Sequence, residues 1–301
     1  MDTNTVLETR VFSDSRKKLQ IERRALLIRR FVSNRLLVTG SVIVVALCFI
    51  AMLAPFISSY TPYEMKAEIR LQAPSMEHIF GTDNFGRDLF SRVMYGTRVS
   101  MIVGFTVSLI TMILGTVIGL YSAYFKFLDH ILMRICDGLM AFPGILLAIA
   151  LTAALGSNMI NVIIALSIIS TPAIARVVRS AAMVVKEQVY IEALKAQGAS
   201  SWRIIWQHVA PNTISPLIIQ ITFVFASSIL IEAALSFLGA GIAPPNPSLG
   251  NILFDGKVVI FTAWWMTVFP GLFILLSVLG LNLFGDGLRD LLDPHSNKAR
   301  K

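Results

Sequence analysis

Side chains that could carry out catalysis are few in this sequence, and their spacing fits no enzyme site. The only Gly-Lys pair, Gly256-Lys257, lacks the upstream glycine and the following Ser or Thr of a phosphate-binding loop. Cys48 and Cys136 form no CxxC or metal-ligand spacing, so packing inside helices is the expected role of both. The four histidines are too far apart to complete a triad or a metal cluster, and they are His78, His130, His208 and His295. We therefore expect no enzymatic activity, metal site or cofactor in this chain.

One polar segment between two long apolar regions has a spacing that suggests a function. Residues 189–197 have the composition of a short helix, and Gly198 is placed to end it, as glycine commonly does. Ser200 or Ser201 can cap a second short helix, which gives an elbow of two helices (residues 189–209, called the elbow below). Its outward face would consist of Tyr190, Ile191, Glu192, Leu194 and Lys195. Such a face suits a groove on another protein, and an ordinary linker between helices is the alternative.

The elements that position the elbow are expected to be membrane-spanning helices. The chain is 55% hydrophobic and only 15% charged, whereas soluble domains carry about 25% charged residues. About 20 apolar residues cross a bilayer, and five uncharged windows are longer than that. The longest window, 138–175, contains the turn signal Gly156-Ser157-Asn158, so we divide it into two spans. The six expected spans are 36–57, 99–122, 138–155, 159–175, 212–231 and 259–284.

The basic residues indicate how these spans are oriented. With a cytoplasmic N-terminus, 20 of the 26 Lys and Arg residues fall in the inner segments, which are 1–35, 126–137, 176–203 and 286–301. Cytoplasmic loops are enriched in this way. The net charge of +8 is therefore interpreted as a topology signal, with the basic tail against anionic lipid, rather than as a sign of nucleic-acid binding. We expect both termini and the elbow in the cytoplasm.

The first outer segment, residues 58–98, is expected to end in an amphipathic helix over 85–97. Apolar and polar side chains alternate there with helical spacing, and Asp88 and Arg92 are four residues apart, as in a helical ion pair. We expect this helix to lie along the outer membrane interface and to lead into the second span.

The second outer segment is expected to begin at Glu232 and to continue to residue 257. A carboxylate at the middle of a bilayer costs about 2.5–3.5 kcal/mol, and a position at or beyond the interface avoids that cost for Glu232. Pro244 and Pro245 stiffen the segment before the last span.

The expected spans contain almost no ionisable side chain at depth. Ion-coupled carriers usually need such groups, and no inverted internal repeat of the kind found in many carriers stands out. Uphill transport would then depend on a separate ATPase. A stand-alone channel or secondary carrier, and a membrane scaffold without a pathway, are the alternatives. Small polar residues are the candidates for lining a pathway, namely Thr152, Asn158, Asn161, Ser167 and Gln220.

Several motifs resemble those of one transporter family. E-A-L-K-A-Q-G at 192–198, followed by Pro211, resembles the EAA loop of ABC importer permeases, with departures at Leu194, His208 and Ala210. Further segments resemble the C-type permease subunit of dipeptide, oligopeptide and nickel importers. These are F-G-T-D-N-F-G-R-D-L-F-S-R at 80–92, E-A-A-L-S-F-L-G-A-G at 232–241, P-P-N-P-S at 244–248 and F-G-D-G-L-R-D-L-L-D-P at 284–294. The resemblance covers about residues 20–294.

The resemblance implies partners and roles for individual residues. The partners would be a homologous B-type permease, two ATPase subunits that bind ATP and Mg²⁺, and an extracytoplasmic solute-binding protein, all at the bacterial inner membrane. ATPase coupling would fall to Tyr190, Glu192, Ala193, Leu194, Gly198 and Pro211, with Glu192 pairing with a basic residue of the ATPase. Contact with the binding protein would fall to Asp83, Arg87, Asp88, Pro244 and Pro245. Di- or oligopeptides are the expected cargo, and nickel chelates, glutathione or oligosaccharides are alternatives.

The predicted architecture is an all-α membrane protein with six transmembrane helices and the type I ABC importer permease fold. It would comprise a cytoplasmic basic tail at 1–35, the first transmembrane helix and outer loop at 36–98, a core permease domain of five spans at 99–285 with the EAA-like loop at 186–212, and a cytoplasmic tail at 286–301.

Overall fold

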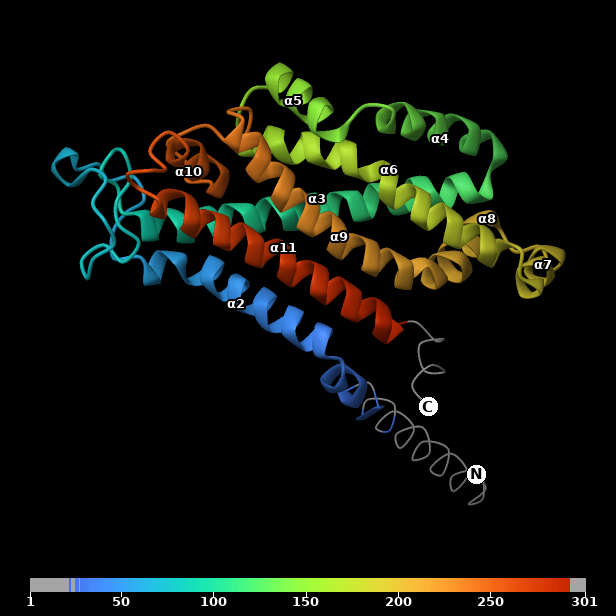
Figure 1. The fold of residues 1–301 in the computed structure, drawn as a ribbon. Coiled ribbons are helices and arrows are strands. Elements are labelled where there is room, and N and C mark those ends of the chain that lie inside the picture. The colour runs from blue at the N-terminus through green and yellow to red at the C-terminus, as the bar shows by residue number, and fades with distance from the viewer. Residues whose placement is uncertain (1–21, 23–24, 27, 293–301) are drawn as a thin grey trace, which may run out of the picture.

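The computed structural model describes residues 22, 25–26 and 28–292, and every regular element in these ranges is helical (Figure 1). The elements are α2 (Arg35–Ile57), η1 (Ala67–Ile69), α3 (Leu89–Tyr124), α4 (Lys126–Met140), α5 (Gly144–Leu155), α6 (Met159–Lys186), α7 (Val189–Ala196), α8 (Ser201–Arg203), η2 (Ile204–Val209), α9 (Ala210–Phe237), α10 (Leu249–Gly256) and α11 (Trp265–Leu292). The predicted tails 1–35 and 286–301 lie largely outside the described residues, although α11 continues to Leu292. The predicted all-α class is confirmed.

Five helical runs are long and apolar enough to cross a membrane, and they contain α2, α3, α6, α9 and α11. The remaining predicted span, 138–155, is not one straight helix. α4 ends at Met140, and α5 begins at Gly144 after a bend of 92°. With 12 residues, α5 is about 18 Å long, too short to cross a hydrocarbon core of about 30 Å by itself. Pro143 explains the break, because it lacks an N–H donor and its ring clashes with a preceding helical turn.

The long helices pack around α3 (Figure 1). α3 contacts α6 and α9, α11 packs against both α9 and α2, and α4 and α5 lie on the side of the bundle opposite α2. Glycines allow the close approaches: an added Cβ would lie 2.5 Å from the ring of Phe225 at Gly104, and 2.6 Å from the carbonyl oxygen of Ala175 at Gly119. The core therefore depends on small residues of α3.

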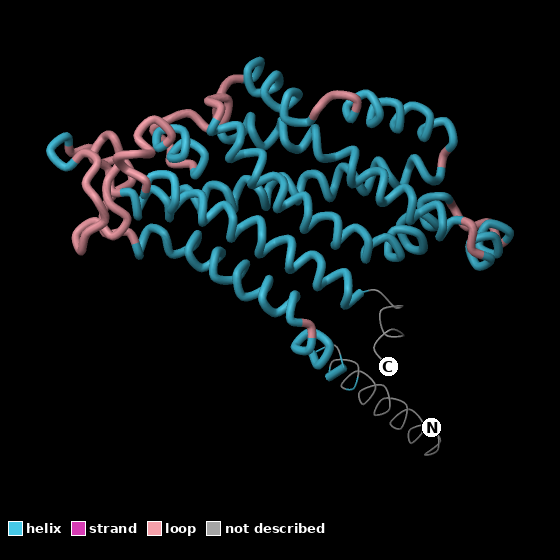
Figure 2. Tube along the Cα trace, viewed as in Figure 1, coloured by secondary structure: helices cyan, strands magenta, loops and turns pink. Residues whose placement is uncertain are grey.

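The connections gather mainly at the two ends of this bundle (Figure 2). The loop of residues 58–88 and α10 form one end, called the loop end below. α7 and the turns beside it project from the other end, called the elbow end.

The helix predicted over 85–97 is not a separate interfacial helix, so that prediction is wrong. α3 begins at Leu89 and continues without interruption through the span. Asp88 caps its first turn by accepting a hydrogen bond from the N–H of Ser91 at 2.7 Å. Side chains on both sides of this turn are at most 3% exposed, including Ser91, Arg92 and Val93. Tertiary contacts at the loop end bury the polar side chains that the amphipathic pattern assigned to water.

α9 also begins differently from its prediction. α8 and η2, a π-helical segment, lead directly into α9 and give one run of 37 residues from Ser201 to Phe237. The second limb of the elbow is therefore the start of this run rather than an independent short helix. Pro211 lies at the start of α9. A proline cannot donate to the preceding turn, and the wider π-helical geometry occurs directly before it.

Candidate functional site

α7 is the first limb of the elbow and ends where the sequence indicates. The N–H of Gly198 donates to the carbonyl of Lys195, and the N–H of Ala199 donates to that of Leu194, both at 3.0 Å. This pair of bonds is the Schellman arrangement, which places a residue in the left-handed region; Gly198 has φ +80°. An added Cβ would meet no atom within 4 Å, so backbone conformation alone favours glycine there. The predicted end of the helix is confirmed.

The outward face predicted for the elbow is only partly exposed. Ile191 is fully buried in the same core cluster as Ile204 and Ile205, and Leu194 is half-buried against it. The prediction for Ile191 is wrong, because this side chain attaches α7 to the bundle. The exposed positions of this limb include Tyr190, Glu192, Ala193, Lys195 and Gly198.

The second limb of the elbow is fixed by a cap and a side-chain contact. Of the two predicted candidates, Ser200 is the cap, and its hydroxyl accepts a hydrogen bond from the N–H of Arg203 at 3.4 Å. The amide of Asn212 donates to the hydroxyl of Tyr190 at 3.5 Å, which joins the two limbs. Pro211 is exposed beside this contact. The structure therefore brings five of the six predicted coupling residues to the elbow surface, with Leu194 half-buried beneath them.

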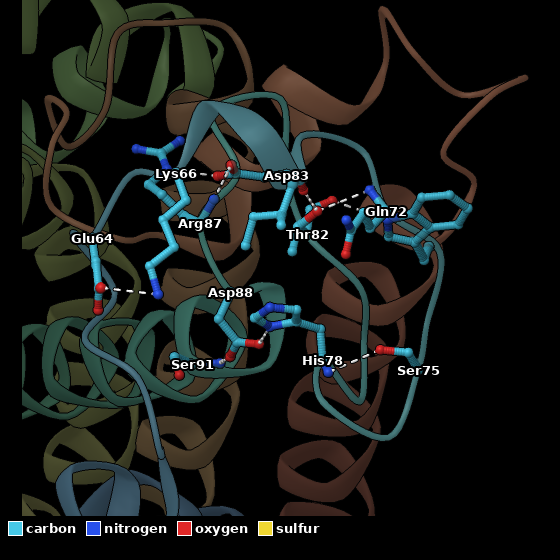
Figure 3. A network of polar contacts seen from close by, with 12 residues as sticks. Glu64, Lys66, Gln72, Ser75, His78, Thr82, Asp83, Arg87, Asp88 and Ser91 are labelled. Carbon is cyan, nitrogen blue, oxygen red and sulfur yellow. Dashed lines mark hydrogen bonds and ion pairs between the residues drawn. The ribbon is translucent and has the colours of Figure 1, made fainter.

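Asp83 is the centre of a buried charge network at the loop end (Figure 3). One carboxylate oxygen accepts a hydrogen bond from Nε of Arg87 at 2.6 Å and lies 3.4 Å from Nε of Arg92. The other oxygen accepts two backbone N–H bonds. Arg87 also lies 3.6 Å from the carboxylate of Asp255 in α10. Burial raises the pKa of Asp255, whereas the guanidinium groups of Arg92 and Arg87 act to lower it.

Asp88 has different partners from those expected. Besides capping α3, its carboxylate lies 2.8 Å from Nδ1 of His78 (Figure 3). The His78 ring is tilted against the ring of Tyr60, with 4.9 Å between centroids. The ion pair predicted between Asp88 and Arg92 does not form; Arg92 contacts Asp83 instead. Long-range contacts have replaced the local helical pairing.

Burial decides which outer residues can meet another protein. Asp83, Arg87 and Asp88 are at most 5% exposed, so they organise the loop and do not present a contact surface. The expectation that they contact a binding protein is therefore corrected. Pro244 and Pro245 are exposed at the loop end and keep that candidate role.

Glu232 is fully buried within α9, and this helix continues to Phe237, past the predicted end of the span at residue 231. One oxygen accepts hydrogen bonds from Ser236 at 2.9 Å and Ser248 at 2.7 Å, and the other accepts one from Ser100 at 2.9 Å. Hydroxyl groups thus replace water around the carboxyl group, as buried polar groups require. The three serines come from α3, α9 and the residue that caps α10, so Glu232 joins these elements.

Gln220, one of the predicted pathway residues, lines a cavity of about 300 Å³ between α5, α6 and α9. Ser170 of α6 and Ser227 of α9 also line it, together with apolar side chains. We call it the neutral cavity. Uncharged donors and acceptors beside apolar walls suit a solute with amide groups.

The other predicted pathway residues make local contacts in this structure. Thr152 is fully buried, and its hydroxyl donates to the carbonyl of Ala148 in its own helix at 3.0 Å. Asn158 caps α6, and the amide of Asn161 donates to two carbonyls in the turn after α5. Ser167 is buried within α6. Asn158 and Asn161 therefore shape the α5–α6 connection.

Two ion pairs join α4 to α6, and the sequence analysis singled out neither. Nη2 of Arg176 lies 2.7 Å from Oδ1 of Asp137, while Arg179 makes two bonds to Asp129, at 2.5 and 2.7 Å. The side chains of the first pair are 46% and 50% exposed, and those of the second 30% and 26%. A second cavity, of about 400 Å³ and called the charged cavity below, is lined by Met133, Asp137, Arg176 and Arg179. The available signal was that Asp137 and Arg176 flank the longest uncharged window.

A solved structure shares this arrangement of helices. The structure of the MetNI methionine ABC transporter in inward-facing conformations matches with a TM-score of 0.55 and 19% identity, covering 67% of this chain and 97% of that one. The fold is therefore that of a type I ABC importer permease.

Sequence comparison gives the family. The binding-protein-dependent transport system inner membrane component matches residues 115–298, and the N-terminal transmembrane domain of oligopeptide transport permease C matches residues 24–74. The chain belongs to this family of inner-membrane permeases, as the resemblance of its motifs predicted, and is a multi-pass membrane protein.

Curated relatives align over most of both chains. A putative peptide transport system permease protein of Brucella abortus is 48% identical over 266 residues, which cover 88% of this chain and 90% of the relative. The dipeptide transport system permease protein DppC of Alkalihalophilus pseudofirmus is 44% identical, with 88% of each chain covered. The glutathione transport system permease protein GsiD of Pectobacterium atrosepticum is 42% identical, with 88% and 89% covered.

Proposed function

We propose that this chain is the C-type permease subunit of an ATP-driven importer that moves di- or oligopeptides across the bacterial inner membrane. The similarity to permeases named for peptide and dipeptide transport supports this cargo. The complex would also contain a homologous B-type permease, two ATPase subunits that hold ATP and Mg²⁺, and an extracytoplasmic binding protein. This chain would supply part of the pathway, and ATP hydrolysis would take place on the separate ATPase subunits.

The observation that carries the proposal is the exposed elbow. α7 projects from the bundle, and its attachment includes one buried side chain, Ile191 (Figure 1). Glu192 and Tyr190 are exposed on it, where an ATPase groove could receive them. Glu192 would pair with a basic residue of that groove. The elbow end, with both chain termini, would be cytoplasmic, because the basic residues concentrate on that side.

A charge reversal on the elbow tests this assignment. Glu192→Lys should lower ATP-driven peptide uptake about tenfold or more, because it opposes a basic partner with a like charge. Glu187→Lys is the matched control, since Glu187 is an exposed glutamate outside α7. Uptake of labelled peptide would be measured in a deletion strain that expresses each variant, normalised to the amount in the membrane. Normal uptake with Glu192→Lys would contradict coupling through this residue.

Glutathione is a second candidate cargo, because a relative named for glutathione transport is 42% identical over the same part of the chain. Glutathione is itself a tripeptide with free charged ends, so both cargoes make similar demands on a pathway. Uptake of labelled dipeptides, longer peptides and glutathione in the deletion strain distinguishes them. Restored uptake of glutathione alone would favour the second candidate over the first.

A further inference from the structure

We propose that Arg176 and Asp137 form a site in this subunit that binds the charged ends of a peptide during its passage. Arg176 would take the terminal carboxylate, and Asp137 would take the terminal ammonium group. The inference rests on the proposed peptide import and adds a specificity site to it.

The position of this pair along α6 supports the assignment. Ser170 and Ala173 of α6 line the neutral cavity, and Arg176 lines the charged cavity. These three residues follow one another at intervals of three, so they lie near one face of the helix. The two cavities are thus successive along α6, and a peptide would meet neutral hydrogen-bonding groups at one and opposite charges at the other.

The charges of the pair indicate that Arg176 and Asp137 meet water rather than lipid. A charged side chain exposed to hydrocarbon is costly, and ionisable groups at membrane helices usually face a bundle interior or a water-filled path. Exposed apolar side chains occur on both sides of the bundle, with Val45 and Phe49 of α2 on one side and Ile131 and Ile135 of α4 on the other. Only the charged cavity, and not the whole face, is therefore assigned to the aqueous path.

The two ion pairs between α4 and α6 differ in how readily they can exchange partners. Arg179 binds Asp129 through two nitrogens, and the side chains of this pair are the less exposed of the two pairs. Arg176 engages Asp137 through one nitrogen, and both side chains are about half exposed. Half-exposed single bonds are weakly held, whereas a guanidinium group binds a carboxylate best through two parallel bonds. A peptide carboxylate can therefore replace Asp137 on Arg176 and leave Asp137 free for the ammonium group.

The test compares four versions of one tripeptide, with free ends, an amidated C-terminus, an acetylated N-terminus, or both. ATP-driven uptake would be measured in proteoliposomes containing the complete importer, at concentrations of each peptide that saturate the binding protein. We expect Arg176→Gln to lower the maximal rate for the free-acid peptide about tenfold and to leave the amidated peptide unchanged, because a hydrogen bond between charged groups is lost. Asp137→Asn should likewise lower the maximal rate for the peptide with a free N-terminal amine and leave the rate for the N-acetylated peptide unchanged.

A purely structural pair gives a different result. If Arg176 and Asp137 only hold α4 against α6, each single variant lowers all four rates equally, and the exchanged variant Asp137→Arg with Arg176→Asp restores them. Equal lowering of all four rates by the single variants would overturn the proposal, and so would rescue by the exchanged variant. Equal rates for all four peptides in the wild type would overturn it too. Arg179→Gln is the control, and it should lower the four rates by one common factor. Absence of ATP-driven uptake of every peptide by the wild-type importer would overturn the proposed function as well.

Discussion

Oδ1 of Asp137 lies 2.7 Å from Nη2 of Arg176, although 38 uncharged residues separate these two charges in the sequence. The contact requires the chain to leave along α5 and return along α6, so that both ends of the window 138–175 reach the same level of the bundle. Division of this window into two helices is thereby confirmed. The same contact places two opposite charges where a cavity opens between α4 and α6.

The turn of the elbow should depend on the left-handed conformation of Gly198. Gly198→Ala should reduce uptake several-fold, because alanine in that region costs about 1–2 kcal/mol and the cost is relieved by reshaping the turn. Gly198→Asn is the control, since asparagine tolerates the conformation better. The rates would be measured per amount of protein in the membrane. Equal losses of uptake for both variants would show that the elbow requires the absence of a side chain at position 198 and not its left-handed φ.

The enclosed carboxyl group of Glu232 should contribute strongly to stability. Glu232→Leu removes the acceptor for Ser100, Ser236 and Ser248, and each unsatisfied buried hydroxyl costs about 1–3 kcal/mol. Glu232→Gln keeps an acceptor of similar shape and should lose far less. Thermal unfolding of the detergent-solubilised protein measures the difference. A leucine variant as stable as the glutamine variant would contradict the importance of these bonds.

The buried network around Asp83 should hold the loop end together. Asp83→Asn leaves Arg87 and Arg92 without their main acidic partner, and breaking a buried ion pair costs about 3–5 kcal/mol. The control is Glu64→Gln, which breaks an exposed pair with Lys66 worth about 0–1 kcal/mol. Limited proteolysis should cleave within residues 58–88 faster in the Asp83 variant alone. Similar cleavage of the two variants would refute this role.

Close packing between α3 and α6 should make Gly119 sensitive to a single methyl group. Its added Cβ would lie 2.6 Å from a backbone oxygen of α6, whereas one at Gly138 of α4 would meet nothing within 4 Å. Gly119→Ala should therefore lower stability by about 1–3 kcal/mol through overpacking. Gly138→Ala should be neutral or stabilise by up to about 1 kcal/mol, because alanine favours helix. Unfolding temperatures of both variants provide the comparison, and a stable Gly119→Ala protein would argue against tight contact.

The features that local rules could predict are those set by neighbouring residues. The membrane helices follow from uncharged windows, and the end of α7 follows from the single glycine at position 198, since hydropathy and backbone conformation are local properties. Ser200 could be named as a cap for the same reason. The break at Pro143 was the exception, because proline can either kink or end a helix and the choice depends on packing.

Features that depend on distant partners could not be predicted. The sequence shows the cost of burying Glu232, but one of the hydroxyls that offset it, that of Ser100, is 132 residues away. Asp88 was paired with Arg92 because they are one helical turn apart, whereas the folded loop supplies His78 and Asp83. Ile191 was predicted to face outward as part of a docking surface, whereas in the folded protein it packs against Ile204 and Ile205 of the bundle.

The run of 37 residues from Ser201 to Phe237 is about 55 Å long, which exceeds the thickness of the hydrocarbon core. It starts within the elbow and carries Glu232 near its other end, so one continuous helical run links the elbow end to the loop end. η2 is the wider, π-helical stretch of this run. α7 joins the run through the turn at Gly198, so a movement of α7 would have to pass through that turn before it reached the serines around Glu232.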